Sequence, residues 1–399
     1  MKNLIYFEIK KIKKIKKINN LLFFFSKILI AIYFFIFIFI FTNKTKSFKE
    51  LVLKSGRKYL NKCLKGLINK RIKIEISEKP KISVIIPIYN SHKTIKSAIT
   101  SIQNQNMIDI EIILIDDNSK DNSLKIIENI KKKDPRIKII NNRINMGILY
   151  SRCIGVLNSK GKYILNLDHD DMFFDEDVFN KLYQTAEKGN FDIVSFMEVQ
   201  GNDYYISPKY MEDGICTYHH PDGHIVHQPE LSYYTLFKNE SFSFVDIQIW
   251  GKLFRTKIYK KAINLLGKER YSIFNTINED MIGLYAICRV AKTYIYIRKY
   301  GLFHFISSST ASNIVTKNHQ MNMEIFLIDV VFDLSINNNK KYAAILAIRL
   351  KTMSYYQLLN TKGKQYLFSV LKKIMNCKFI EEKYKKELIL LYTDFKLLQ

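Results

Sequence analysis

Three carboxylates within four residues follow a short apolar run near the middle of the chain. The run at residues 163–167 is β-rich and continuous, as in a strand buried in a parallel sheet, and it leads into Asp168, His169, Asp170 and Asp171. Carboxylates this close repel one another, so the cluster does not serve stability alone. A divalent cation would relieve the repulsion, and Mg²⁺ and Mn²⁺ prefer oxygen ligands. We therefore expect a metal site here, with a solvated acidic loop as the alternative.

The elements before this cluster alternate between strand and helix. The apolar pattern predicts strands at residues 82–86, 110–115 and 137–140, and helices at residues 94–103, 124–131 and 148–157. Because each strand is apolar on both faces, the expected fold class is α/β, with a mostly parallel sheet flanked by helices. Ligands bind beyond the carboxyl ends of such strands. The polar residues after Ile86, Ile115 and Leu167 all lie on that edge, which favours a site over a simple loop.

Two common phosphate-binding motifs are missing from the sequence. No GxGxxG follows the first strand, and no GxxxxGK[ST] occurs anywhere, which argues against a dinucleotide dehydrogenase and a P-loop ATPase. The phosphates of a bound nucleotide must then be held in another way. A divalent metal on Asp170, Mn²⁺ or Mg²⁺, is the substitute that we expect.

A set of short motifs across residues 82–173 resembles the core of family 2 glycosyltransferases. The matching pieces, in order, are Pro87–Asn90, Ile115–Ser119, Asp121–Ser123, Asn145–Gly147 with Arg152, Gly161–Tyr163 and the DxD of Asp168–Asp170. Cys153 departs from the family, whose members often have Asn after the Arg. The resemblance implies the GT-A fold, a Rossmann-like sheet flanked by helices, and a nucleotide-diphosphate sugar as donor.

The resemblance also implies roles for these residues. The turn at residues 87–90 and Asp117 would hold the base and ribose, Asp168 would lie near the ribose, and Asp170 would bind the metal that bridges the diphosphate. A carboxylate such as Asp117 can accept the N–H of uracil, although an Asx turn or a helix N-cap would use it equally well. The expected nucleotide-sugar-binding residues are Pro87, Tyr89, Asn90, Asp117, Asn145, Gly147, Arg152, Asp168 and His169.

A second acidic pair lies at residues 279–280, followed by apolar residues at helical spacing. Asn278 is a plausible N-cap, and carboxylates in a first helical turn are favoured electrostatically, which is the structural alternative. The resemblance implies that this pair supplies the catalytic base, with Asp280 as first choice and Glu279 as second. A helix N-terminus lowers the pKa of a carboxyl group, so Asp280 is expected to be ionised and able to accept a proton.

Further candidates follow from the chain between residues 200 and 315. The segment from Ile249 to Arg255 resembles the family again, and its Trp250 and Lys252 are expected acceptor contacts, with a core residue and a structural cation as alternatives. A strand is predicted at residues 294–298 and a loop at residues 301–312. His304 in that loop is a candidate metal or phosphate ligand, or else a packed core histidine.

The cysteine and histidine patterns give little support for a zinc site. Five cysteines are widely scattered without a CxxC pair. Histidines 219, 220, 224 and 227 flank a predicted hairpin turn at Pro221–Gly223, which would place them on differing faces. We expect an acceptor-facing flap in residues 200–248 instead, because aromatic side chains offer flat surfaces to sugar rings.

The amino-terminal segment predicts a membrane anchor. Residues 21–42 are almost wholly apolar, and about 20 such residues span a bilayer. Residues 1–20 are a basic tail and residues 43–80 a basic stalk. Because positive charge flanks the apolar segment on both sides, it does not decide which end of the segment faces the cytosol. We expect a single-pass signal anchor, with the catalytic domain in the lumen of the Golgi or ER or, alternatively, facing the cytosol.

The net charge of +26 does not predict nucleic-acid binding. Residues 1–80 hold 20 of the 63 Lys and Arg residues but only 4 of the 37 Asp and Glu residues, so much of the charge lies outside the expected catalytic domain. No nucleic-acid-binding motif occurs. The expected domain covers residues 81–315, with a nucleotide-sugar and metal half (81–199) and an acceptor half (200–315), and residues 316–399 form a helical extension.

These observations predict a membrane-anchored, metal-dependent inverting transferase of a hexose or hexosamine. The donor would be a nucleotide-diphosphate sugar, UDP-linked, and the acceptor a hydroxyl of a glycan, protein or lipid. Two alternatives stay open: a synthase that transfers sugar to a polyprenyl phosphate, and an inactive membrane protein that binds nucleotide sugars.

Overall fold

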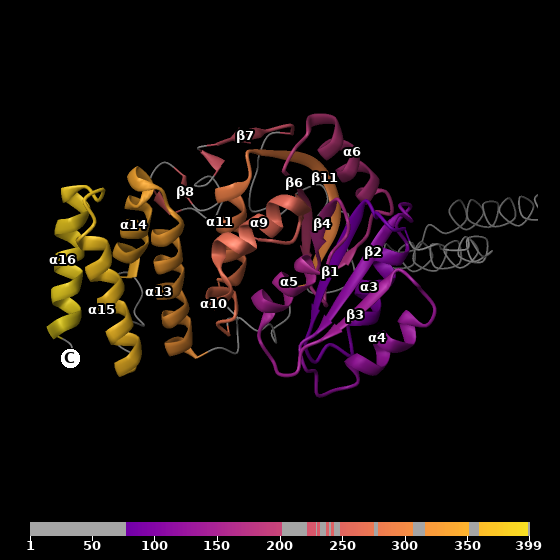
Figure 1. The fold of residues 1–399 in the computed structure, drawn as a ribbon, viewed down its shortest axis with the longest axis horizontal. Helices are drawn as coiled ribbons and strands as arrows, with labels where there is room; N and C mark the ends of the chain where they lie inside the picture. Colours follow the sequence, from indigo (N-terminus) through magenta and orange to yellow (C-terminus); the bar gives the residue numbers. More distant parts are fainter. Residues whose placement is uncertain are drawn as a thin grey trace, which may run out of the picture. The chain divides into compact units, whose positions relative to one another are not determined.

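The computed structural model describes most of the chain after residue 76. The described residues are 77–201, 222–228, 230–231, 237–238, 241–242, 248–274, 278–305, 316–350 and 359–397. The expected tail, membrane span and nearly all of the expected stalk lie outside these residues, as does most of the expected flap. Figure 1 shows the described part, in which a twisted sheet is followed by a row of helices.

The first half of the sheet is parallel, as the alternating pattern predicts. It consists of β1 (Ile82–Ile88), β2 (Ile110–Asp116), β3 (Ile137–Asn141) and β4 (Tyr163–Asn166). Their order in space is β3-β2-β1-β4, and every neighbouring pair is parallel. The carboxyl ends of all four strands therefore lie on one edge.

The second half of the sheet mixes strand directions. Strand β10 (Lys252–Arg255) runs antiparallel between β4 and β6 (Ile193–Gly201), and β11 (Thr293–Phe305) then pairs in parallel with β6. Two short strands, β5 (Met172–Phe173) and β7 (Ile225–His227), pair antiparallel with β11. Strands β8 (Phe237–Lys238) and β9 (Ser241–Phe242) form a separate small sheet.

Helices cover both faces of the sheet. On one face, α3 (Ile95–Gln103), α4 (Ser123–Lys131) and α6 (Val178–Gly189) pack against Val84 and Ile86. On the other face, α5 (Ile148–Leu157), α9 (Thr256–Leu266), α10 (Lys268–Tyr271) and α11 (Glu279–Val290) share a core with Ile85 and Ile113. Neighbouring residues of β1 thus point to opposite cores, as expected of a strand buried on both faces.

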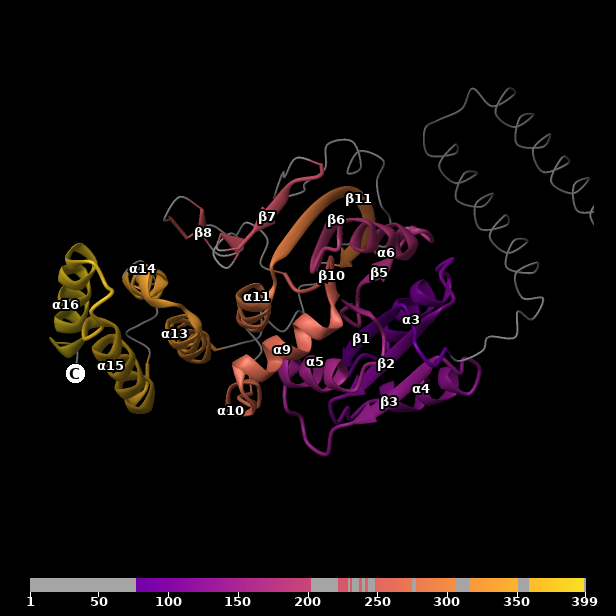
Figure 2. The same cartoon turned by 45° about the horizontal axis from the view of Figure 1, so that its top comes forward.

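The carboxyl-terminal residues form the predicted helical extension. It consists of α13 (Lys317–Leu334), the 3₁₀ turn η1 (Asn337–Asn339), α14 (Lys341–Arg349), α15 (Thr361–Met375) and α16 (Glu382–Leu397). These helices continue the core of α9 and α11, so they belong to the same hydrophobic unit. Figure 2 shows them stacked beyond α11, on the side away from β1 to β4.

Two expectations about the fold are corrected. The predicted fold class included a transmembrane helix, but among the helices within the described residues none is both long and apolar enough to cross a membrane. The segment 21–42 itself lies outside those residues, and the fold class is corrected to a GT-A-like α/β sheet followed by helices. The second correction concerns residues 301–305, which continue β11 and are not a loop.

Candidate active site

The loops after β1 and β2 are joined by hydrogen bonds between backbone amides and polar side chains. The amide of Asn90 donates to Ser119 Oγ (3.1 Å), that of Lys120 to Asn90 Oδ1 (2.8 Å), and that of Ser91 to Ser123 Oγ (2.7 Å). Asn90 has a φ of 50°, a left-handed conformation that Asn tolerates better than most residues. The two loops therefore form one rigid rim at the carboxyl edge.

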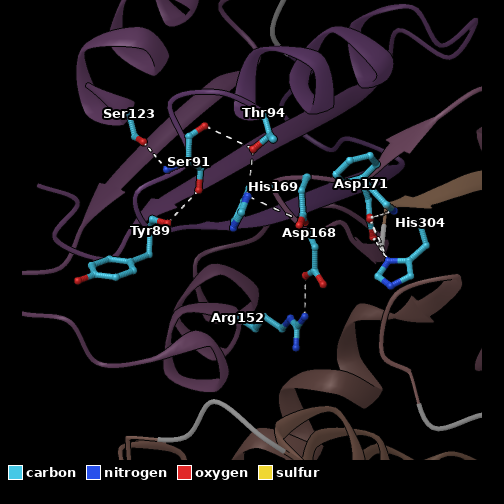
Figure 3. Close-up of polar contacts among 11 residues, drawn as sticks. Tyr89, Ser91, Thr94, Ser123, Arg152, Asp168, His169, Asp171 and His304 are labelled. Carbon is cyan, nitrogen blue, oxygen red and sulfur yellow. Dashed lines mark hydrogen bonds and ion pairs between the residues drawn. The ribbon is translucent and has the colours of Figure 1, made fainter. Parts of the chain in front are cut away.

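Two predicted binding residues differ sharply in exposure at this rim. Pro87 lies within β1 and is buried. Tyr89 is 44% exposed, and its ring points away from Ser91 in Figure 3. Its flat face is therefore open to a planar ligand.

Asp117 organises the turn that leads into α5. Its Oδ1 accepts hydrogen bonds from Asn142 Nδ2 (2.8 Å) and the amide of Met146 (2.9 Å), and its Oδ2 accepts from the amide of Gly147 (2.8 Å). The same Gly147 amide reaches Asn145 Oδ1 (3.1 Å). The carboxylate is buried and tied to the turn before α5, which is neither the Asx turn nor the helix N-cap left open by the sequence, and base binding stays a prediction.

Arg152 joins the two acidic motifs of the chain. Its side chain on α5 is 1% exposed, Nη2 donates to Asp168 Oδ1 (2.7 Å), and Nη1 donates to Asp280 Oδ1. Glu279 Oε1 lies 3.7 Å from the same Nη1. Figure 3 shows the guanidinium below Asp168. The sequence predicted a nucleotide contact for Arg152, but the structure gives it carboxylate partners.

Burial and the charge of Arg152 set opposite pKa directions within this group. Burial alone would raise the pKa of Asp168, but the charge and hydrogen bond of Arg152 outweigh it and lower that pKa. Burial raises the pKa of Asp280 despite the opposing Arg152. The pKa of Asp280 is thus raised, whereas its position at a helix N-terminus predicted a lowered one, and burial is the largest cause. Burial, together with the charge of Asp280, raises the pKa of Glu279 to about 8.

A second buried pair lies beside the DxD motif. Asp171 has a fully buried side chain, and each of its carboxylate oxygens lies 3.0 Å from His304 Nδ1. The amide of Phe305 also donates to Asp171 (3.0 Å). Burial raises the pKa of Asp171 to about 6. Burial would lower the pKa of His304, but Asp171 outweighs it and raises that pKa to about 9.

Trp250 packs flat against His304. Their ring centroids are 4.5 Å apart and the rings are inclined by 18°. Trp250 is 5% exposed, and Lys252 is 1% exposed with its Nζ donating to the carbonyl of Gln248 (2.6 Å). Trp250 is therefore a core residue and Lys252 a structural cation, as their alternatives had it. Neither side chain presents an open surface to an acceptor. Their acceptor roles stay untested predictions.

His169, the middle residue of the motif, lies beside Thr94 at the start of α3. His169 Nδ1 lies 3.2 Å from Thr94 Oγ1, as Figure 3 shows, and 4.0 Å from Asp170 Oδ1. Burial and the charge of Asp168 raise the pKa of Asp170. A cation bound there would lower that pKa and favour the ionised carboxylate. Within the described residues, however, no three His, Cys, Asp or Glu side chains are placed to hold a metal without other ligands.

Sequence reasoning missed several residues of this site. Tyr259 on α9 is buried near Arg152 and Asp280, and the backbone of Ile249 hydrogen-bonds the Asp280 carboxylate. Nothing in the local pattern around Tyr259 distinguishes it from a core aromatic. Asp171 was noticed in the sequence, but its pairing with His304 depends on β11, whose length was underestimated.

The family and the fold follow from comparison with known proteins. Residues 83–262 match the family model described as glycosyl transferase family 2. Residues 83–262 therefore carry a glycosyltransferase family 2 domain. That match includes the DxD motif and Arg152, and it ends before the acidic pair at residues 279–280.

Two bacterial proteins illustrate the likeness of the chain to known glycosyltransferases. It is 30% identical over 193 residues to the uncharacterized glycosyltransferase EpsJ of Bacillus subtilis, covering 48% of this chain and 52% of that protein. It is 28% identical over 261 residues to the cholesterol galactosyltransferase of Borreliella burgdorferi, covering 63% and 67%. The chain spans about half the length of the first curated relatives that it matches.

A solved structure supports the fold of the chain. Staphylococcus aureus TarS, residues 1–349 in complex with UDP-GlcNAc, has a TM-score of 0.55 and 15% sequence identity, covering 79% of this chain and 90% of that one. At this identity the likeness concerns the fold alone. The predicted GT-A architecture is confirmed.

Proposed function

We propose that this protein transfers a sugar from a UDP-linked donor to an acceptor hydroxyl with inversion at the anomeric carbon. The observation that carries the proposal is the position of Asp280, which Arg152 holds beside Asp168 although the two acidic motifs are more than 100 residues apart. A donor-binding motif and a candidate base thus face one site. The TarS complex with UDP-GlcNAc supports the choice of a UDP donor.

Asp280 accepts the acceptor's proton in this mechanism. The acceptor oxygen attacks the anomeric carbon as its proton passes to Asp280, and the bond from that carbon to the leaving diphosphate breaks. One displacement from the face opposite the diphosphate inverts the configuration. Arg152 keeps Asp280 oriented and partly offsets the cost of ionising it in a buried position.

The residues around the DxD motif fit a divalent metal shared with the donor. Asp170 offers a hard carboxylate ligand, although burial raises its pKa. His304 could bind the metal through the ring nitrogen not used by Asp171 only after losing the proton that Asp171 stabilises. Donor phosphate oxygens would complete the ligand set. When bound, the metal offsets the negative charge of the leaving diphosphate.

The test is a donor screen with the full chain. UDP release would be measured for a panel of UDP-hexoses and UDP-N-acetylhexosamines, with and without Mn²⁺, in the presence of acceptors suggested by the relatives' names: cholesterol and an undecaprenol-linked glycan. We expect one donor to give metal-stimulated release and a β-linked product from an α-linked donor. Absence of turnover and of hydrolysis for every donor would reject the proposal.

A further inference from the structure

The loop at residues 248–252, just before β10, contacts two elements that carry candidate site residues. The ring of Trp250 stacks on His304 of β11, with the centroids 4.5 Å apart. The side chain of Ile249 packs on α11, where a Cβ added at Gly283 would lie 3.1 Å from Ile249 Cδ1. Neighbouring residues of one short loop thus touch both the strand that carries His304 and the helix that carries the candidate base.

Lys252 closes this loop with its side chain. Its Nζ donates to the carbonyl of Gln248 (2.6 Å), four residues earlier, and the residue is 1% exposed. Between them Gly251 has a φ of 68°, in the left-handed region, and its carbonyl accepts the amide of Phe196 on β6 (3.0 Å). A buried ammonium group costs stability, and an apolar side chain would fill the same space without that cost. Packing alone therefore does not account for a lysine here.

The stacked indole restricts how His304 can lie. The two rings are inclined by only 18°, and His304 Nδ1 is 3.0 Å from each carboxylate oxygen of Asp171. Figure 3 shows the imidazole beside that carboxylate. A rotation of the imidazole would break the stack on Trp250 and move Nδ1 away from Asp171 at the same time. The position of Trp250 is thus coupled to the orientation of His304.

We propose that Lys252 is a positioning residue, which closes the loop at residues 248–252, holds Trp250 on His304 and so keeps the imidazole directed at Asp171 beside the DxD motif. The part of this inference that concerns donor binding rests on the proposed function. The part that concerns the loop does not, because the environment of Trp250 is measurable in the protein alone.

Tryptophan fluorescence tests the loop directly, because Trp250 is the only tryptophan of the chain. Lys252→Met keeps an unbranched apolar stem and removes the ammonium donor. We expect its emission to move to longer wavelength and its quenching constant with acrylamide to rise about threefold, since an opened loop exposes the ring. The matched control is Lys260→Met, which removes an ammonium-to-carbonyl contact of the same kind on α9, to Ser159 (2.8 Å). This control should change neither quantity.

A second pair of variants tests the loop without altering its charge. A Cβ at Gly251 has ordinary space, with Glu198 Oε2 as its nearest neighbour at 3.5 Å, so Gly251→Ala strains only the left-handed backbone. We expect Gly251→Ala to shift the emission of Trp250 in the same direction as Lys252→Met, by a smaller amount. Gly251→Asn should stay closer to the unaltered chain, because Asn tolerates this conformation better than Ala.

Donor binding is measured by calorimetric titration with UDP. Loss of a group that orients a ligand-binding side chain typically weakens binding by about 10- to 100-fold, and we expect Lys252→Met to weaken UDP binding by about tenfold. The value of kcat at saturating donor should change much less, because Lys252 acts on binding and not on the proton transfer. A merely structural role predicts a lower melting temperature with unchanged UDP affinity in the folded protein.

Two outcomes would overturn the inference. One is emission and quenching in Lys252→Met equal to those in Lys260→Met, and the other is an unchanged affinity for UDP in Lys252→Met. If Lys252→Met does not fold, the Gly251 variants decide, and equal emission in Gly251→Ala and Gly251→Asn then rejects the role of the loop. If the unaltered chain binds no UDP, the proposed function fails, and the fluorescence still decides whether Lys252 holds Trp250 in place.

Discussion

Arg152 and Asp280 form an ion pair that links α5 to α11 across 128 residues of sequence. The same guanidinium reaches Asp168, so one buried cation connects the donor motif to the candidate base. Removing either carboxylate leaves a buried charge with fewer partners, which is costly in a low-dielectric environment. Four of the predictions below concern this site, and one concerns stability elsewhere.

Asp280→Asn should abolish transfer while preserving donor binding. The amide keeps the shape of the carboxylate but cannot accept the acceptor's proton, and loss of a general base typically slows a reaction by about 10²- to 10⁴-fold. Turnover and the calorimetric affinity for the UDP-sugar are the two measurements. Glu279→Gln is the matched control and should keep most of the activity. Near-normal turnover of Asp280→Asn would instead favour an acceptor that needs no base, such as a polyprenyl phosphate.

Arg152→Lys should reduce kcat by more than about tenfold with a much smaller change in donor affinity. Lysine keeps the charge but cannot donate in two fixed directions to Asp168 and Asp280. Steady-state kinetics and nucleotide titration separate the two effects. The control is Arg143→Lys, an exposed change on the neighbouring loop, which should alter neither kcat nor donor affinity. An equal loss of affinity and kcat would show that Arg152 contacts the nucleotide, as the motif resemblance implied.

Asp170→Ala should remove the metal dependence of nucleotide binding. The variant loses the carboxylate that we assign to the metal, so Mn²⁺ should no longer strengthen UDP binding. Calorimetric titration of UDP with and without Mn²⁺ measures this directly. Glu176→Ala removes a nearby exposed carboxylate and should retain the full metal effect. A variant whose UDP affinity still responds to Mn²⁺ would remove Asp170 from the ligand set.

Gly147→Ala should weaken nucleotide binding as well as the fold. Gly147 has φ 89° and ψ 167°, a region open essentially only to glycine, and a side chain there costs about 1–3 kcal/mol. The strain would displace the amides that hold Asp117. Gly267→Ala is a matched control, because Gly267 (φ 84°, ψ 145°) has a similar backbone at the start of α10. The Gly267→Ala variant should lose stability but keep donor affinity. Equal donor affinities in Gly147→Ala and Gly267→Ala would contradict the prediction.

Asp134→Asn should destabilise the protein by about 3 kcal/mol at pH 7, because it breaks a buried pair with Arg136 whose side chains are each 3% exposed. Burial would raise the pKa of Asp134, but hydrogen bonds from Arg136 and Gln103 outweigh it and lower that pKa.

The sign of its pH dependence follows from this lowered pKa. Since the folded pKa lies below the unfolded one, the stabilisation is complete above the ordinary Asp pKa and is lost as the pH falls through the folded value. Urea unfolding of both proteins from pH 7 to pH 2 should show the difference shrinking. Glu128→Gln, an exposed carboxylate on α4, should change stability by less than about 0.5 kcal/mol at any pH. A constant difference for Asp134→Asn would contradict this account.

The parallel half of the sheet could be predicted because its signals are local. Each strand is a continuous apolar run and each helix has its own amphipathic period, so α5 begins and ends at the predicted residues 148 and 157. The antiparallel strand β10 gives no such signal. It has four residues, and its place between β4 and β6 depends on partners that are distant in sequence.

The length of β11 was underestimated for a physical reason. Arg298 and Lys299 interrupt its apolar pattern, and the pairing with β6 shifts register between Ile297 and Leu302. Gly301 lies there because a Cβ would come within 2.5 Å of Val178. A glycine two residues after a pair of cations predicts a loop from the local sequence. The pairing of β11 with β6 nevertheless continues the strand past this point. His304 was therefore named as a candidate without its partner Asp171.

The pKa of Asp280 shows the same limit. Sequence position gives the favourable helix terminus, but burial depends on how α5, α9 and β10 pack around the residue, which no local pattern determines.

The spacing of the Arg152 ion pairs has a consequence for biosynthesis. A chain made from its amino terminus contains Arg152 and Asp168 well before Asp280 leaves the ribosome. Until then the guanidinium lacks the partner that α11 supplies, and closing α5 over the sheet would bury charge at a cost. Packing of α5 onto the sheet therefore becomes more favourable once α11 has been synthesised, which couples maturation of the donor half to arrival of the base.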